Sequence, residues 1–148
     1  MSLKERVFDD MKAAMRARDR ARLSAIRLLL AAMKQKEVDE RIALADTDVL
    51  GIIDKMIKQR RESIAQYAKA GRNDLADAEK YEILVLTAYL PQPMGESEIE
   101  QAVLAALSEA GAAGVKDMGK VMSVLKPRLA GRADMSKVSA LVKSRLSG

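Results

Sequence analysis

The stretch LPQPMG, from Leu90 to Gly95, decides how this chain of 148 residues is divided. It holds two of the chain's three prolines, followed by a methionine and a glycine. Proline lacks a backbone N–H donor, so neither a helix nor a β-ladder continues easily through such a segment. We therefore predict a domain boundary here, with an N-terminal domain at residues 1–92 and a C-terminal domain at residues 93–148.

On the N-terminal side of this boundary, apolar residues recur every three or four positions, which is typical of amphipathic helices. Ser2 and Glu5 have the spacing of a capping box and open the first helix. Caps at Asp46 or Thr47 and at Asn73 or Asp74 open the third and fourth. The pattern predicts four helices, at about residues 3–18, 20–37, 47–70 and 74–90.

On the C-terminal side, Ser97 and Glu100 repeat the capping-box spacing and predict a helix that ends near Gly111. The stretch GKVMSVLKPRLAGRADMSKVSALVK, residues 119–143, predicts two further helices separated by the break GRAD. An alternating strand pattern is absent from the sequence. The predicted fold class is therefore all-α, with an N-terminal four-helix domain followed by a small C-terminal three-helix bundle.

Composition excludes several classes of function. Hydrophobic residues make up 49% of the chain and charged residues 32%, too apolar for a disordered protein and too charged for a membrane protein. The absence of cysteine and histidine excludes disulfides, thiolate nucleophiles, zinc sites built from these ligands and imidazole acid–base chemistry. Glycine-rich phosphate loops and nucleophile elbows are also missing. We expect neither a cofactor nor a metal, and catalysis by this chain alone is disfavoured.

The first residues, MSLKERVFDDMK, mix acidic and basic side chains and contain no apolar secretory core. The longest apolar run, residues 23–33, is too short to span a bilayer and contains Arg27. We therefore expect a cytoplasmic protein without a membrane partner.

Two carboxylates, Glu79 and Glu82, fall on the predicted apolar face of the fourth helix. Buried carboxylates need cationic partners, and the sequence offers Arg27 together with Arg60 or Arg61. A carboxylate dyad for acid–base work, or a divalent-metal site, is the functional alternative. We favour a structural ion-pair network that fixes how the helices dock, because no nucleophile accompanies the pair.

The C-terminal part of the chain is disproportionately basic. Between Val115 and Gly148, eight Lys or Arg stand against Asp117 and Asp134, a net charge of +6 where the whole chain carries +5. Such an excess suits phosphate backbones, and a solubilising surface explains it equally well. A second basic cluster occupies residues 12–22. The candidate nucleic-acid-binding residues are Lys116, Lys120, Lys126, Arg128, Arg132, Lys137 and Lys143.

Two longer stretches resemble a known family across essentially the full chain. They are KQRRESIAQYAKAGRNDLADAEKYEILVLTAYLPQPM, residues 58–94, and DMGKVMSVLKPRLAGRAD, residues 117–134. Their residue spacing is similar to that of the YqeY-like protein family. One departure is Met135, because the family usually has glycine after GRAD, and this affects the expected turn into the last helix.

The resemblance implies a noncatalytic, tRNA-associated protein. The C-terminal half of the family is similar to the tail domain of the B subunit of glutamyl- and aspartyl-tRNA amidotransferases, a helical appendage that contacts tRNA and has no active site. The family's label of carbon–nitrogen ligase with glutamine as amido-N-donor belongs to the catalytic part of that enzyme, which this chain is too short to contain.

Three functions follow as hypotheses. The first is a noncatalytic module whose last two helices bind tRNA or another structured RNA. The second is an adaptor whose helical grooves hold a partner protein's helix. The third is an accessory factor that binds amidotransferase subunits.

Overall fold

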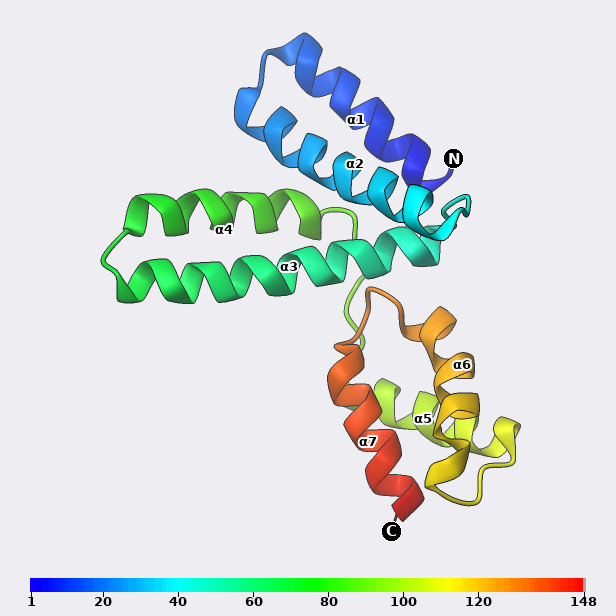
Figure 1. Cartoon of the computed structure of the whole chain (residues 1–148). Helices are drawn as coiled ribbons and strands as arrows, with labels where there is room; N and C mark the ends of the chain where they lie inside the picture. The colour runs from blue at the N-terminus through cyan, green and yellow to red at the C-terminus, as the bar shows by residue number, and fades with distance from the viewer. Residues whose placement is uncertain (148) are drawn as a thin grey trace. The chain divides into compact units, whose positions relative to one another are not determined.

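The computed structural model describes residues 1–147, and its regular secondary structure is entirely helical (Figure 1). Its chain divides into two compact units, Met1–Leu90 and Pro91–Gly148. The described part of the chain contains seven α-helices and one short 3-10 helix, and it contains no β-strand. The all-α prediction is therefore confirmed.

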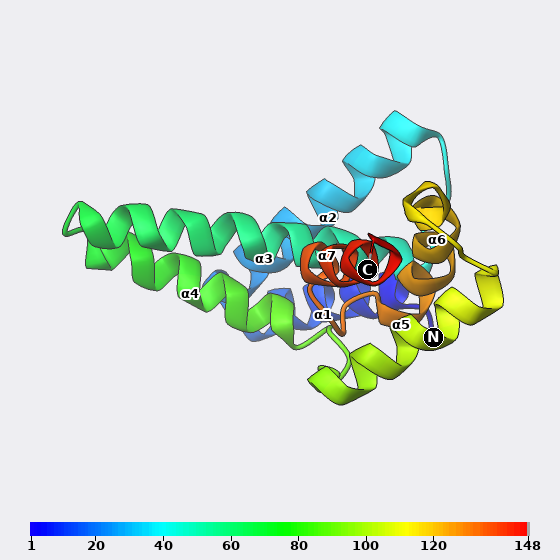
Figure 2. The ribbon, with the colours of Figure 1, turned by 90° about the horizontal axis from the view of Figure 1, so that it is seen from below.

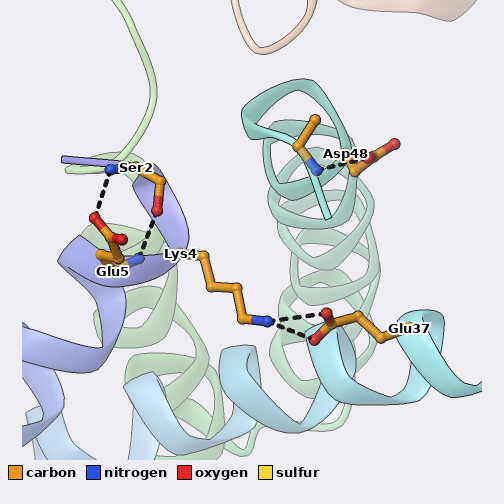
Figure 3. Close-up of polar contacts among 6 residues, drawn as sticks. Ser2, Lys4, Glu5, Glu37 and Asp48 are labelled. Atoms are coloured by element: carbon orange, nitrogen blue, oxygen red, sulfur yellow. Dashed lines mark hydrogen bonds and ion pairs between the residues drawn. The ribbon is translucent and has the colours of Figure 1, made fainter. Parts of the chain in front are cut away.

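The first two helices, α1 (Leu3–Ala17) and α2 (Arg20–Glu40), form an antiparallel hairpin. The predicted capping box at the start of α1 is present: the Ser2 hydroxyl accepts from the Glu5 N–H, and the Glu5 carboxylate accepts from the Ser2 N–H (Figure 3). Arg18 ends α1 in the left-handed conformation, and the Asp19 side chain caps α2. The turn between the two helices therefore needs only residues 18 and 19.

The next two helices, α3 (Asp46–Lys69) and α4 (Asn73–Thr87), lie antiparallel along each other in both ribbon views (Figures 1 and 2). Caps at Asp46 or Thr47 and at Asn73 or Asp74 are wrong, because the N-cap residues are Ala45 and Arg72. The Asp46 carboxylate instead accepts from the Leu3 N–H at the start of α1, at 2.9 Å. The Asp46 side chain therefore forms a tertiary hydrogen bond with α1 and does not cap α3 as the local pattern predicts.

The core of the first unit is built from the inward faces of all four helices. Val7, Ile26, Leu29 and Ile53 are fully buried, and Leu86 of α4 is 1% exposed. These are the apolar positions that recur at helical spacing in the sequence. At these positions the helical periodicity coincides with the inner faces, whereas Phe8 and Met15, which recur at the same spacing in α1, are 41% and 49% exposed.

The second unit contains α5 (Glu96–Ala110), the 3-10 helix η1 (Val115–Asp117), α6 (Met118–Leu129) and α7 (Met135–Ser147). Gly95, not Ser97, is the N-cap of α5, since the Gly95 carbonyl already accepts from the Ile99 N–H. The predicted capping box at Ser97 is wrong for that reason. Met135, the departure from the family pattern, is the first residue of α7, and the preceding Asp134 side chain accepts from the Ser136 N–H at 2.9 Å.

A separate apolar core holds the second unit together. Val121, Leu125 and Leu129 of α6 are fully buried and meet Val103 of α5 and Val142 of α7. None of the helices in the described range is long and apolar enough to cross a membrane.

The segment that follows Leu90 is tied to the second unit. Arg132 donates from Nε to the Gln92 carbonyl at 3.0 Å, and the Met94 N–H donates to the Arg132 carbonyl at 2.9 Å. These bonds explain why the division falls before Pro91, whereas the predicted boundary follows Gln92. That each unit is an independent folding domain stays a prediction.

Candidate functional site

The acidic pair of α4 meets one arginine of α3. Arg60 Nε lies 2.6 Å from a carboxylate oxygen of Glu82 and 4.0 Å from one of Glu79. The three side chains are 14%, 25% and 23% exposed, respectively, so the cluster is half-buried and not part of the dry core. Arg60 Nη1 also donates to the Met56 carbonyl at 3.3 Å, which holds the guanidinium along its own helix.

The two carboxylates are electrostatically unequal. Partial burial raises the pKa of Glu79, the neighbouring Glu82 charge raises it further, and Arg60 only partly offsets both effects. A separation of 4.0 Å is the outer limit of an ion pair, so Arg60 stabilises the charge of Glu82 more strongly than that of Glu79. The geometry supports a link that docks α4 on α3, and no group of three metal-ligating side chains exists among residues 1–147.

The structure does not bring the other two predicted members of this network together with it. Arg27 is exposed on α2 and Arg61 is exposed on α3. On α2, the buried positions Ile26, Leu29 and Met33 define one face, and Arg27 lies about 100° from Ile26 around the helix axis, on the outer side. Because residues 23–33 are almost all apolar, the sequence alone did not show which face of α2 is buried and on which side Arg27 lies.

A second polar cluster in the first unit had no signal in the sequence. The Tyr89 hydroxyl donates to the Asp10 carboxylate at 2.6 Å, and the guanidinium of Arg6 lies 4.9 Å from the centre of the Tyr89 ring. Burial and then the hydrogen bond to Asp10 raise the pKa of Tyr89. Because Tyr89 lies 79 positions after Asp10, only the fold makes this contact, which anchors the end of α4 to α1.

The arginines of the basic C-terminal set pair with glutamates of α5. Arg128 Nη2 lies 2.7 Å from Glu109, and Arg132 Nη2 lies 3.8 Å from Glu98. Arg145 pairs with Glu100 in the same way. These contacts offset a large part of the positive charge that the sequence predicted for this region.

The lysines of the same set remain accessible. All five are exposed, and in the described part of the second unit none of them forms an ion pair. Asp117 lies between two of them, and a backbone hydrogen bond from Ala113 lowers the pKa of its carboxyl group. The five residues are Lys116, Lys120, Lys126, Lys137 and Lys143.

A model of the YqeY-like protein family matches residues 4–146, which cover nearly all of both units and every candidate site residue. The chain belongs to this family. Similar curated relatives are named "Altered inheritance of mitochondria protein 41, mitochondrial": one from Eremothecium gossypii is 43% identical over 55% of this chain, and one from Pyrenophora tritici-repentis is 32% identical over 83%. An uncharacterized protein of Schizosaccharomyces pombe is 32% identical over 61% of this chain and 70% of its own length.

The YqeY-like chain spans 45% of the Eremothecium relative and 71% of the Pyrenophora relative. Both relatives carry a mitochondrial name, and this contradicts the prediction of a cytoplasmic protein. That prediction is therefore wrong as we made it. It relied on the mixed charges of the first twelve residues. These residues form the cap and most of helix α1, so their charges are explained by the folding of that helix and carry no information on location.

Proposed function

We propose that this YqeY-like protein is a noncatalytic, RNA-associated module in which the second unit contacts the phosphate backbone of tRNA or a similarly structured RNA. The observation that supports the proposal is the contrast between the two kinds of basic residue: the arginines pair with α5, while the five lysines are left exposed. Exposed ammonium groups gain most from phosphate, because each contact releases a condensed counterion.

The lysines are not equivalent in this proposal. Lys116 and Lys120 are four residues apart, at η1 and the start of α6, so they lie close enough to follow one phosphate strand. Lys137 and Lys143 are six residues apart on α7, which separates them by about 120° around the helix axis. The start of α6 is therefore the most favourable contact point.

Charge reversal tests the proposal. We expect the Lys116→Glu, Lys120→Glu double variant to weaken tRNA binding about tenfold or more, and to reduce the slope of log affinity against log salt concentration by about 1 to 2. Filter binding or fluorescence anisotropy with tRNA, across a salt series, measures both quantities. The matched single variants are Lys120→Gln and Arg128→Gln, which each remove one charge; the arginine change removes a charge already paired with Glu109 and should change affinity less.

Binding that does not depend on salt would contradict the proposal, as would equal effects of the lysine and arginine variants. An accessory role beside amidotransferase subunits belongs to the same proposal, because the resemblance of the C-terminal half is to the tail of such an enzyme. Co-purification with those subunits tests that part separately.

A further inference from the structure

The first unit has a groove lined by apolar and basic side chains, and the proposed RNA contact by the second unit does not involve it. It runs between α1 and α2, and we call it the α1–α2 groove. Its lining includes Phe8 of α1 and Leu30, Ala31, Lys34 and Val38 of α2. The ion pair from Lys4 to Glu37, at 2.9 Å, spans the two helices at one end of it (Figure 3).

The groove exposes apolar side chains that are not part of the core of the first unit. Phe8 is 41% exposed and Val38 is 63% exposed, whereas their neighbours Val7 and Met33 are buried in the core. Helices α3 and α4 supply the remaining core contacts of the hairpin, and no helix of the first unit lines this groove besides α1 and α2. Covering Phe8 and Val38 with another apolar surface would remove that area from water.

The charges around the groove are mainly positive. Lys34 lines it, Arg27 is seven residues earlier on the same face of α2, and Lys12 follows Phe8 by one helical turn. All three are exposed, and none forms an ion pair within residues 1–147. The acidic residue in the lining, Glu37, is already paired with Lys4.

This combination favours one kind of occupant. A concave groove between two helices is the surface on which a third helix packs, ridges into grooves. Lipid headgroups present a broad surface that does not enter such a groove, and RNA would leave Val38 uncovered. The unpaired cations on both borders favour negative charge on whatever covers the apolar floor.

We propose that the α1–α2 groove binds an amphipathic helix of a partner protein, with apolar residues along the face that enters the groove and Asp or Glu along its borders. Phe8 and Val38 contact the apolar face of the bound helix, while Lys12, Arg27 and Lys34 pair with its carboxylates. This site is independent of the RNA contact, since it uses only residues of the first unit.

A designed peptide provides the probe. We use a fluorescent helical peptide of about 18 residues, with Leu at three- and four-residue spacing and Glu on both borders, and a matched peptide with Lys in place of every Glu. Anisotropy titrations with the full chain should show saturable binding of the Glu peptide, at least about tenfold tighter than that of the Lys peptide. Amide chemical shifts should change in α1 and α2.

Variants assign the binding to the groove. Arg27→Glu with Lys34→Glu should weaken the Glu peptide about tenfold and favour the Lys peptide, and Val38→Asp should weaken both peptides without loss of fold, because Val38 is mostly exposed. The matched control is Arg61→Glu with Lys69→Glu, which makes the same charge change at exposed positions of α3 and should have little effect.

The proposal would be overturned by no saturable binding of the Glu peptide up to about 1 mM, by equal binding of the two peptides, or by an equal effect of the control variant. It would also fail if the Arg27 and Lys34 changes reduced binding to tRNA, or to vesicles of anionic phospholipid, more than binding to the peptide. The Lys116 and Lys120 variant separates this proposal from the RNA proposal, because it should leave peptide binding unchanged.

Discussion

At the scale of single residues, the cluster around Arg60 shows how one cation serves two carboxylates unequally. Glu82 forms the close contact with Arg60, at 2.6 Å, and Glu79 lies at the outer limit, at 4.0 Å. Removing Glu82 leaves a guanidinium that is only 14% exposed without its close partner. Removing the charge of Glu79 relieves repulsion with Glu82.

We therefore predict opposite effects for two isosteric substitutions at neutral pH. Glu82→Gln should lower the free energy of unfolding by about 1–2 kcal/mol, because it takes away the partner of a half-buried charge. Glu79→Gln should leave stability unchanged or raise it slightly. Urea unfolding followed by circular dichroism measures both, and an equal loss in the two variants would contradict the assignment.

The pH dependence has a definite sign. The pKa of Glu79 is higher in the folded protein than its ordinary value of 4.5, so the folded state binds this proton more tightly than the unfolded state does. The contribution to stability is therefore present below that ordinary value and is lost as pH rises through the folded pKa. We predict that Glu79→Gln abolishes this loss, which sets in as pH rises above about 4.5, and pH-dependent urea unfolding measures it against the parent chain.

At the scale of the elements, helix ends follow local chemistry in some places and tertiary contacts in others. Ser2 caps α1 as its spacing predicts, whereas Asp46 bonds to the start of α1 and leaves Ala45 as the cap of α3. Gly131 follows α6 with φ of 73°, in the left-handed region where a side chain is strained. Gly51 lies inside α3, and an added Cβ there would meet no atom within 4 Å.

Alanine at these two glycines should act in opposite directions. We predict that Gly131→Ala destabilises the second unit by about 1 kcal/mol or more, because alanine disfavours a positive φ. Gly51→Ala should stabilise the first unit by about 0.5–1 kcal/mol. Gly51 lies inside a helix, where alanine is favoured over glycine because it lowers the conformational entropy of the unfolded chain. Thermal unfolding, with each unit followed by its own amide resonances, measures the two effects.

At the scale of the whole molecule, the residues before and after LPQPMG in the sequence form two separate apolar cores. The first is centred on residues such as Leu29 and Ile53, and the second on Val121 and Leu125. The proline segment from Gln92 to Met94 bonds to Arg132 and so belongs to the second unit. Each of these cores is formed by residues of its own unit.

We predict that residues 91–148 fold when produced alone. The fragment should give a dispersed amide spectrum that superimposes on the corresponding signals of the full chain, and a cooperative thermal transition. Its stability should be low, because a domain of roughly 60 residues buries only about 60% of its unfolded surface. A fragment of residues 1–90 is the control, and a collapsed spectrum for residues 91–148 would show that the second core depends on the first unit.

The sequence by itself determined the all-α class and most of the buried helical positions. Each of these follows from local rules, namely the 3.6-residue period of apolar side chains and the backbone limits of proline and glycine. These rules act over a few residues, and tertiary contacts override them only at ends such as Asp46.

Only the tertiary structure decided which charges are paired. It selected Arg60 over Arg27 and Arg61 for the acidic pair, and it placed the glutamates of α5 beside arginines up to 45 residues away while leaving the lysines exposed. Pairing depends on the distance between side chains, and that distance is set by how helices pack and not by their order along the chain.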